Sequence, residues 1–290
     1  MRKGFKDKFS AWFSIIRVGN CIALSYAAII GYLLAYRRYP DIIDVLKLIL
    51  SVFTIGGSSN IINDYFDAPI DSINKPWRPI PSGIIKPKSA LAASIIMGLT
   101  GIAIAFNISF LAGLLASVAF TLSYLYSYKL KKVLLVGNIV VAFLAALSIV
   151  YGGTVFGINN ARISDVAIAS LFAFLLNLGR EFLKGIEDVV GDKKYGIQTI
   201  ATCFGVKIAY MSSVVIFSIL IMLSIVPYLM LRYSIYYLVI ALVGVDLTVL
   251  ISLIISSTLN PRDALKATRI LKIAVFVGIS AFLVEALKSI

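Results

Sequence analysis

The chain has 290 residues, of which 60% are apolar and only 14% are charged. This balance excludes an ordinary soluble domain and is typical of an integral membrane protein. The formal net charge of +13 could indicate nucleic acid as a partner, so the placement of the charges has to be considered. Two cysteines and no histidine exclude a disulfide framework, a zinc site and histidine-based catalysis.

Apolar runs that are long enough to cross a hydrocarbon core of about 30 Å recur along the chain. They predict one domain, 1–290, that forms an all-α membrane bundle of about nine transmembrane helices around a central cavity opening at the cytoplasmic side. No small-residue cleavage site follows the first run, so we expect an anchor there and not a secretory signal. The expected spans are 18–36, 42–62, 90–107, 109–127, 133–153, 165–181, 208–228, 234–256 and 270–288.

The basic residues follow the membrane topology. With the N-terminus in the cytoplasm, all but six of the 27 basic residues fall in segments expected on the inside. This bias predicts a multi-pass protein of the cell membrane, with the N-terminus and the longest loops on the cytoplasmic side. The basic residues are therefore explained mainly by membrane topology, and secondarily by contact with anionic lipid or substrate. We expect no nucleic-acid partner. The six exceptions are Arg37, Arg38, Lys47, Arg162, Arg232 and Lys288.

An acidic cluster follows the second expected span and reads Asn63-Asp64-Tyr65-Phe66-Asp67-Ala68-Pro69-Ile70-Asp71. If this segment is helical, one face carries Asn63, Asp64, Asp67 and Asp71. Crowded carboxylates are costly unless a cation neutralises them, and hard oxygen ligands suit Mg²⁺ bound to substrate phosphates. Pro69 would weaken or bend such a helix, and the structural alternative is a solvated helix end followed by a loop.

A second cluster, Glu181 to Asp192, follows the sixth expected span. A helix would bring Glu181, Lys184, Asp188 and Asp192 within about 80° of one another, although Gly191 suggests that the helix loosens there. Arg180 and Lys184 add positive charge that a metal site alone does not need, so we expect a phosphate or diphosphate group. Local salt bridges of Lys184 with Glu181 or Asp188 are the structural alternative. Together the two clusters predict a pair of Mg²⁺ sites that hold a diphosphate.

A proline-rich segment, Asn74 to Gly83, follows the first cluster. Three prolines within six residues stiffen the chain and prevent a regular helix. We expect Lys75 and Arg78 to be held near the first acids, where they bind diphosphate oxygens. An ordinary basic loop beside the membrane is the alternative.

Three further polar residues lie at the inner ends of expected spans. Arg17 and Asn20 open the first span, where snorkelling and topology explain Arg17 equally well. Lys129 ends the fourth span and could reach a phosphate, while the tyrosines at 124, 126 and 128 before it are typical of an interfacial belt.

Asp246 is the one acid expected near the middle of the membrane. Pairing with Asn138 or Asn177 and protonation are the open alternatives for it. A transporter would place its ionisable groups near the midplane and open to both sides. Because the other acids of the two clusters gather at one face, the sequence favours an enzyme over an ion-coupled transporter.

The two motifs resemble those of the UbiA-type intramembrane prenyltransferases. The pattern Asn-Asp-x-x-Asp-x-x-x-Asp is complete at Asn63, Asp64, Asp67 and Asp71, and Asp-x-x-x-Asp is complete at Asp188 and Asp192. Nine expected spans agree, so the resemblance covers essentially the whole chain. The stretch from Asn63 to Gly83 is similar to archaeal ether-lipid enzymes and to chlorophyll synthases of this family. The stretch from Arg180 to Thr199 looks closest to the archaeal enzymes and departs from the Asp-Arg-Asp-Asp-Asp form of 4-hydroxybenzoate prenyltransferases.

This resemblance implies Mg²⁺-dependent transfer of a geranylgeranyl group from geranylgeranyl diphosphate to the free hydroxyl of geranylgeranylglyceryl phosphate. A quinone precursor or a tetrapyrrole is the alternative acceptor. The expected partners are therefore a prenyl diphosphate donor, a lipid-phosphate acceptor and membrane lipids, with no obligate protein partner.

The expected roles of the residues follow from the same resemblance and from the charges described above. The catalytic set is Asp64, Asp67, Asp71, Asp188 and Asp192, and either Asp64 or Asp188 would accept the hydroxyl proton. The metal ligands are Asn63, Asp67, Asp71, Asp188 and Asp192. The diphosphate is expected to contact Arg17, Asn20, Lys75, Arg78 and Lys129, and the acceptor phosphate is expected to contact Arg180 and Lys184.

Overall fold

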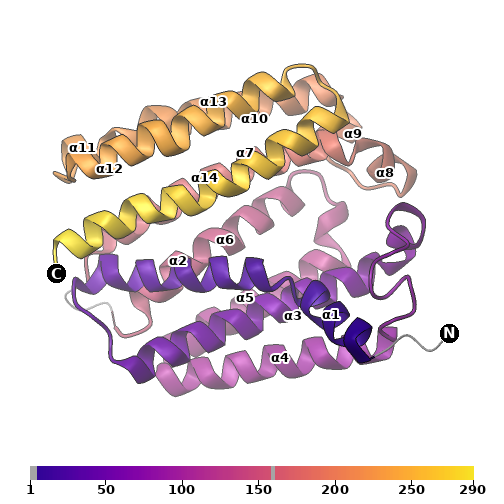
Figure 1. Cartoon of the computed structure of the whole chain (residues 1–290), viewed down its shortest axis with the longest axis horizontal. Helices are drawn as coiled ribbons and strands as arrows, with labels where there is room; N and C mark the ends of the chain where they lie inside the picture. Colours follow the sequence, from indigo (N-terminus) through magenta and orange to yellow (C-terminus); the bar gives the residue numbers. More distant parts are fainter. Residues whose placement is uncertain (1–4, 158–160) are drawn as a thin grey trace. The chain divides into compact units, whose positions relative to one another are not determined.

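The computed structural model describes residues 5–157 and 161–290, and every regular element within these ranges is helical (Figure 1). Element η1 is a short 3₁₀ helix and η2 is a π-helical turn. The elements are α1 (Phe5–Ile16), α2 (Val18–Tyr36), α3 (Ile42–Asn74), α4 (Pro87–Ile108), α5 (Phe110–Tyr128), η1 (Leu130–Lys132), α6 (Val136–Thr154), α7 (Ile163–Glu187), α8 (Val189–Lys194), α9 (Ile200–Cys203), α10 (Val206–Ser224), α11 (Val226–Met230), α12 (Ile235–Val239), η2 (Ile240–Asp246), α13 (Leu247–Ser256) and α14 (Pro261–Lys288).

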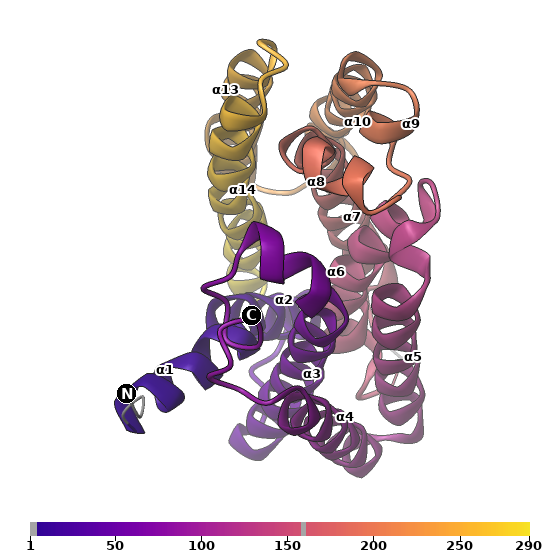
Figure 2. The same ribbon diagram turned by 90° about the vertical axis from the view of Figure 1, so that its right-hand side faces the viewer.

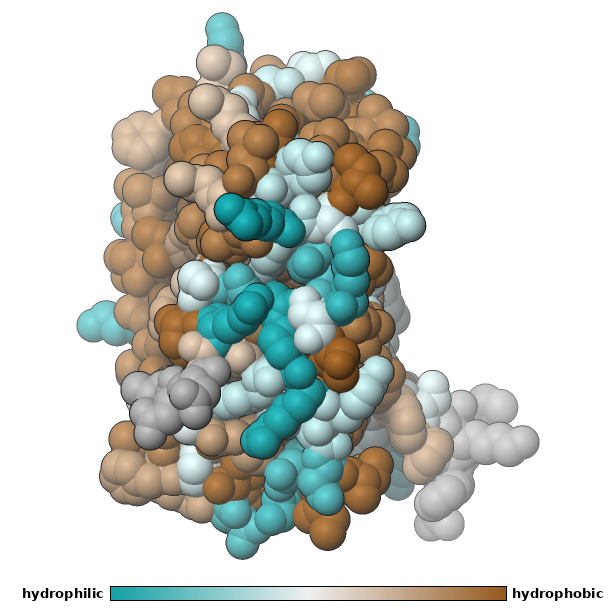
Figure 3. Space-filling view, turned by 90° about the vertical axis from the view of Figure 1, so that its left-hand side faces the viewer, coloured by the Kyte–Doolittle hydropathy of each residue, from teal (hydrophilic) through white to brown (hydrophobic). Residues whose placement is uncertain are grey.

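Nine helical segments within the described ranges are long and apolar enough to cross a membrane, which is the number predicted. Large apolar side chains lie open on the outside of these segments: Ile96 is 65% exposed, Ile254 70% and Ile273 61%. Figure 3 shows apolar side chains over much of one face, with polar side chains among them. Exposed apolar area of this kind is stable in lipid and not in water. The chain is a multi-pass membrane protein.

Contacts divide the chain into two compact units, and each is described by itself. Unit 1 comprises the described parts of 1–29, 40–130 and 154–157, and unit 2 those of 30–39, 131–153 and 158–290. The expectation of a single domain over 1–290 stays a prediction.

Unit 1 is built on α3, which packs against α1, α4 and α5 (Figure 2). Small residues let these helices approach closely, as membrane helices commonly do. The Ser58 hydroxyl donates to the Ser94 carbonyl at 2.7 Å, and the Ser94 hydroxyl lies 2.7 Å from the Tyr124 hydroxyl. Tyr124 therefore joins α5 to α4 inside the unit, whereas Tyr128 is 67% exposed, as an interfacial tyrosine is expected to be.

Unit 2 is built on α7, which packs against α10 and α14. Its core contains Leu183, Phe217 and Leu271, one from each of these helices. At the opposite end of α7, the buried carboxylate of Asp165 accepts from the Arg37 guanidinium at 2.6 Å, and the Glu285 carboxylate accepts from the backbone N–H of Ser234 at 2.7 Å. Arg37 also donates to the Glu285 carbonyl at 2.7 Å, so its guanidinium ties the end of α2 to the start of α7 and the end of α14.

The start of α14 and the end of α3 are among the helix boundaries that differ from the expected spans. Helix α14 begins at Pro261, nine residues before the expected start at 270, because the Asn260 side chain caps it and Ala264 and Ala267 bury one face beneath a charged outer face. Helix α3 continues through Pro69 to Asn74. A proline removes one backbone donor, and the remaining bonds of a long helix can carry that loss.

Candidate functional site

The first acidic cluster lies on the last three turns of α3, so the expected helical arrangement is confirmed. Asp64 and Asp71 are buried, at 6% and 5% exposed, while Asn63 and Asp67 are partly exposed. The Asn63 amide donates to Asp67 Oδ2 at 3.1 Å. One helix face thus presents three carboxylates and one amide.

Arg78 reaches this face from the proline-rich segment. The segment folds as successive turns, and Ile80 and Ile85 bury their side chains against α1, α3 and α4, at 6% and 3% exposed. This anchorage holds Arg78 Nη1 at 2.6 Å from Asp71 Oδ2 and 3.4 Å from Asp64 Oδ1. The predicted placement of Arg78 beside the first acids is therefore confirmed.

Arg17 reaches one of these acids, Asp64, from the break between α1 and α2. Its Nη2 donates to Asp64 Oδ1 at 2.5 Å, so this oxygen accepts from two guanidinium groups. Snorkelling to the interface is thus not the whole explanation of Arg17. The side chains of Arg17 and Arg78 are 32% and 25% exposed, so both cations can be reached by an anionic ligand.

The other three residues expected to contact diphosphate do not join this cluster. Asn20 and Lys129 are exposed, and Lys75 is partly exposed. Within the described ranges, no hydrogen bond or ion pair connects any of these three side chains to the acids of α3. Their contact with diphosphate stays a prediction.

The second acidic cluster spans a break in the helix. Helix α7 ends at Glu187, Asp188 forms its C-cap, and α8 begins at Val189 and carries Asp192. The break comes three residues before Gly191, where we expected the helix to loosen. The backbone N–H of Asp192 still donates to the Asp188 carbonyl at 2.9 Å, so the two acids remain one turn apart with partly exposed side chains.

Ion pairs surround Glu181, which is 7% exposed. Arg180 Nη1 lies 3.2 Å from Glu181 Oε1, and Lys184 Nζ lies 3.9 Å from Glu181 Oε2. The local salt bridge between Lys184 and Glu181, considered as the structural alternative, is therefore present. Lys184 keeps 42% of its side chain exposed, so its cation can also meet a ligand.

Helix α14 supports the same end of α7. Arg180 Nε donates to the Thr268 carbonyl at 3.3 Å, and the Thr268 hydroxyl donates to Glu187 Oε2 at 2.9 Å. Arg180 is 17% exposed and engaged on two sides. Its cation is thus less available to an anion than that of Lys184.

The donor chemistry of both motifs fits Mg²⁺. All candidate ligands, namely Asn63, Asp67, Asp71, Asp188 and Asp192, offer hard oxygen atoms. No group of three acids or cysteines within the described ranges is close enough to form a metal cage. Mg²⁺ commonly needs one or two carboxylates and takes its other ligands from water and substrate phosphates, so a sparse donor set is what this ion requires.

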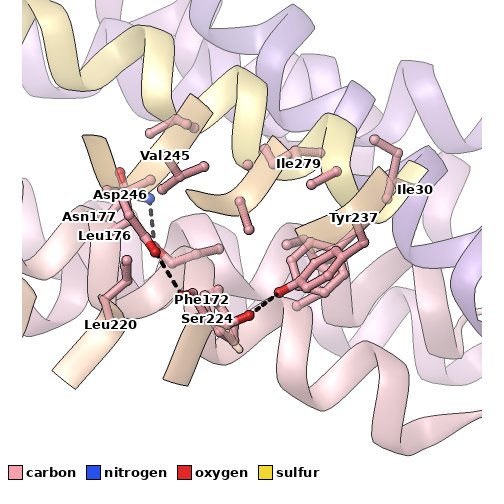
Figure 4. A pocket seen from close by; sticks show the side chains of 18 residues that line it. Ile30, Phe172, Leu176, Asn177, Leu220, Ser224, Tyr237, Val245, Asp246 and Ile279 are labelled. Carbon is pink, nitrogen blue, oxygen red and sulfur yellow. Dashed lines mark hydrogen bonds between the residues drawn. The ribbon is translucent and has the colours of Figure 1, made fainter. Parts of the chain in front are cut away.

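An apolar pocket lies within unit 2, along α7 (Figure 4). The space not filled by atoms in and around it, open solvent included, is about 590 Å³, and residues of α7, α10, η2 and α14 line it. Asp246 is among them: its Oδ2 accepts from the Ser224 hydroxyl at 2.7 Å, and its Oδ1 has no hydrogen-bond partner among the described residues. The partner of Asp246 is thus Ser224, and not Asn138 or Asn177 as we considered.

Two polar contacts were missed from the sequence. Asn60 donates from α3 to the Ile16 carbonyl at 2.8 Å, beside the break that carries Arg17. The polar residues from Ser58 to Asn60 lie inside an expected membrane span, and this pattern could have indicated a polar contact between helices. The pairing of Arg37 with Asp165, 128 residues apart in the chain, had no local signal.

The fold and this polar site define a class: a helical membrane protein with acid-rich, arginine-paired sites at the ends of apolar helices. A model of the UbiA prenyltransferase family matches residues 24–276. The chain therefore belongs to the UbiA prenyltransferase family, as its motifs indicated, and it is a membrane prenyltransferase.

Relatives of known name cover almost the whole chain. A digeranylgeranylglyceryl phosphate synthase from Saccharolobus solfataricus is 36% identical over 277 residues, which are 96% of this chain and 97% of that protein. The protein of the same name from Methanocaldococcus jannaschii is 34% identical over 284 residues, 98% of this chain and 99% of that one.

Two solved structures share the fold. One, described as digeranylgeranylglyceryl phosphate synthase in membranes, matches with a TM-score of 0.78 and 33% identity over 97% of this chain and 99% of that chain. A UbiA homolog from Archaeoglobus fulgidus bound to GPP and Mg²⁺ matches with a TM-score of 0.70 and 20% identity, over 94% and 99% of the two chains.

Proposed function

We propose that this prenyltransferase transfers a geranylgeranyl group from geranylgeranyl diphosphate to the free hydroxyl of geranylgeranylglyceryl phosphate. The product would be the second ether bond of an archaeal membrane lipid. The observation that carries this proposal is the 36% identity, over 96% of the chain, to a digeranylgeranylglyceryl phosphate synthase. The charge distribution supports a cytoplasmic N-terminus and cytoplasmic acidic motifs.

Arg17 and Arg78 are assigned to the donor diphosphate. Each is paired with an acid of α3 and partly exposed, so it is pre-positioned at low cost in side-chain entropy. Their guanidinium groups would bind the diphosphate oxygens and stabilise the negative charge that develops as the leaving group departs. Lys75, Asn20 and Lys129 are assigned to the rim of this site.

Asn63, Asp67 and Asp71 would hold Mg²⁺ in unit 1, and Asp188 and Asp192 in unit 2. When bound, Mg²⁺ withdraws electron density from the diphosphate oxygens and so improves diphosphate as a leaving group. Asn63 fixes the orientation of Asp67 through its amide, as a supporting contact to a metal ligand commonly does.

The acceptor phosphate is assigned to Lys184, with Arg180 in support. The allylic C–O bond of the donor breaks and its electron pair leaves with diphosphate, while the acceptor hydroxyl oxygen forms the new ether bond. Asp64 already accepts two guanidinium groups on Oδ1, so we assign uptake of the hydroxyl proton to Asp188.

The apolar lining of the pocket in unit 2 is compatible with a hydrocarbon tail. Helix α7 lines the pocket up to Asn177 and presents Arg180 and Lys184 less than two turns later. An isoprenoid lipid with its phosphorylated head at the end of α7 would thus have apolar surface for its tail.

The product test is direct. Purified protein with Mg²⁺, geranylgeranyl diphosphate and geranylgeranylglyceryl phosphate should yield digeranylgeranylglyceryl phosphate, identified by mass spectrometry. EDTA should abolish product formation, and added Mg²⁺ should restore it. Parallel reactions with a quinone precursor and a tetrapyrrole acceptor test the alternative. Prenylation of either one, with none of the glyceryl phosphate, would overturn the proposed acceptor.

The Lys184→Ala variant is expected to raise the acceptor KM by about tenfold with little change in the donor KM. The lost interaction is a charge-assisted contact with the acceptor phosphate. Steady-state kinetics with each substrate varied separately provide the measurement. Lys207→Ala is a matched control, since it removes a lysine at the start of α10, outside both motifs. An effect confined to the donor KM would contradict the assignment of Lys184.

A further inference from the structure

The chain breaks between α1 and α2 at a single residue. Arg17 has a φ of +55°, in the left-handed region that L side chains rarely adopt, and helices lie directly on both sides of it. In an unbroken helix the backbone N–H of Asn20 would donate to the Ile16 carbonyl; here it donates to the Arg17 carbonyl at 2.8 Å. The break therefore frees the Ile16 carbonyl inside a membrane protein, where an unsatisfied acceptor is costly.

Asn60 satisfies that carbonyl from the neighbouring helix. Its Nδ2 donates to Ile16 O at 2.8 Å and lies 3.7 Å from Cys21 Sγ, and this thiol also donates to Ile16 O at 3.3 Å. Cys21 is fully buried. Both sides of the break are thus bound to one amide of α3.

Asn60 stands one helical turn before Asp64 on α3. The same helix therefore holds the break through Asn60 and receives the Arg17 guanidinium through Asp64, at 2.5 Å. The strained backbone at Arg17 persists only while surrounding contacts hold it. The hydrogen bond from Asn60 is the shorter of two side-chain contacts to the carbonyl that precedes Arg17, the other being that of the Cys21 thiol.

We propose that Asn60 is a positioning residue, which holds the α1–α2 break so that Arg17 is aimed at the diphosphate of the substrate. This inference rests on the proposed function, because it takes the ligand of Arg17 to be a diphosphate. Asn60 itself does not touch the substrate; it acts through the backbone of residues 16–17. Its loss should weaken diphosphate binding only as long as Arg17 is present.

The test measures the affinity of the full-length protein for inorganic diphosphate with Mg²⁺, by isothermal titration calorimetry. Asn60→Ala should weaken binding by about tenfold, as expected for misplacing one charge-assisted contact. Arg17→Ala should weaken it at least as much. In the Arg17→Ala background, Asn60→Ala should change the affinity by less than about twofold. Asn60 is proposed to act through Arg17, so the effects of the two substitutions should not add.

A second readout follows the break without substrate. In a Cys203→Ser background the buried Cys21 is the one remaining thiol. Asn60→Ala should raise its labelling rate with a small methanethiosulfonate reagent by about tenfold or more, since the break then opens more often. If Asn60→Ala does not fold, both measurements are repeated on Asn60→Leu. Leucine has a similar shape to asparagine, has no hydrogen-bond donor, and is well tolerated in a membrane helix.

Ser58→Ala is the matched control. It removes a buried interhelical hydrogen bond from the same helix, two residues before Asn60, and that bond runs to α4 and not to the break. It should lower the melting temperature and leave both diphosphate affinity and Cys21 labelling unchanged. If the role of Asn60 is merely structural, Asn60→Ala should behave like Ser58→Ala, with a lower melting temperature and unchanged diphosphate affinity and Cys21 labelling.

The outcomes separate the two proposals. Unchanged affinity and unchanged labelling in Asn60→Ala would overturn the positioning role. An equal loss of affinity with and without Arg17 would also overturn it. Failure of the wild-type protein itself to bind diphosphate would count against the proposed function, and the positioning role would fall with it.

Discussion

Asp67→Asn is expected to lower the turnover of the purified enzyme by about a hundredfold or more, as for removal of a metal ligand. The substitution keeps the shape of the side chain and removes its charge. Asp67 is partly exposed and oriented by the Asn63 amide, whereas its neighbours Asp64 and Asp71 are buried against guanidinium groups. The charge lost thus belongs to the most exposed of the three carboxylates. Steady-state rates at saturating Mg²⁺ and donor measure the effect, and Asp188→Asn should behave in the same way.

Asp263→Asn is the matched control for these two substitutions. Asp263 lies in the first turn of α14 and pairs with Lys266 at 2.9 Å, outside both motifs. Its replacement should leave turnover unchanged. Full activity of Asp67→Asn, or activity of the wild-type enzyme that persists in EDTA, would contradict the metal role.

The sequence predicted the helices that carry the motifs because their signals are local. Apolar length marks a membrane span, and four polar residues at positions 63, 64, 67 and 71 fix a common face once the segment is helical. Within α3, Pro69 was the one local objection. It did not end α3, because the helix keeps its other backbone hydrogen bonds on both sides of the proline and its packing against α4 and α5.

The details that aim the arginines could not be predicted in the same way. The position of Arg78 depends on Ile80 and Ile85, whose burial beneath the loop is a tertiary contact. That of Arg17 depends on a left-handed backbone in a stretch that reads as continuous helix. Local propensity favours the unbroken helix, and the hydrogen bond from Asn60 is one of the contacts that favour the break.

Lone acids were the weakest part of the prediction. Asp246 lies on a π-helical turn and pairs with Ser224, a residue with no distinguishing pattern in the sequence. Ser and Thr hydroxyls are common partners of polar groups within membranes, so amides were not the only candidates. Which of several partners is used depends on helix packing, and periodicity carries no information about it.

Arg37→Met is expected to destabilise the protein by about 3–5 kcal/mol, because it leaves the buried carboxylate of Asp165 without its close partner. The Arg37 guanidinium donates to Asp165 Oδ2 at 2.6 Å and to the Glu285 carbonyl at 2.7 Å, and the Asp165 side chain is 4% exposed. Arg162 lies 3.8 Å from the same carboxylate oxygen but is 62% exposed, so water screens it and it is a weak substitute. Thermal unfolding in a fixed detergent measures the change.

Arg38→Met is the matched control, since Arg38 is the next residue, is exposed, and donates at 3.3 Å to Tyr32. This substitution should lower the free energy of unfolding by no more than about 1 kcal/mol. The double variant Arg37→Met with Asp165→Leu removes both charges and should recover most of the loss, because apolar pairs often replace buried ion pairs without cost. Equal melting temperatures for Arg37→Met and wild type would contradict this prediction. They would show that the Asp165 carboxylate can be buried without a cationic partner. If the double variant instead unfolds as easily as Arg37→Met, the stabilisation comes from the Glu285 contact and not from neutralising Asp165.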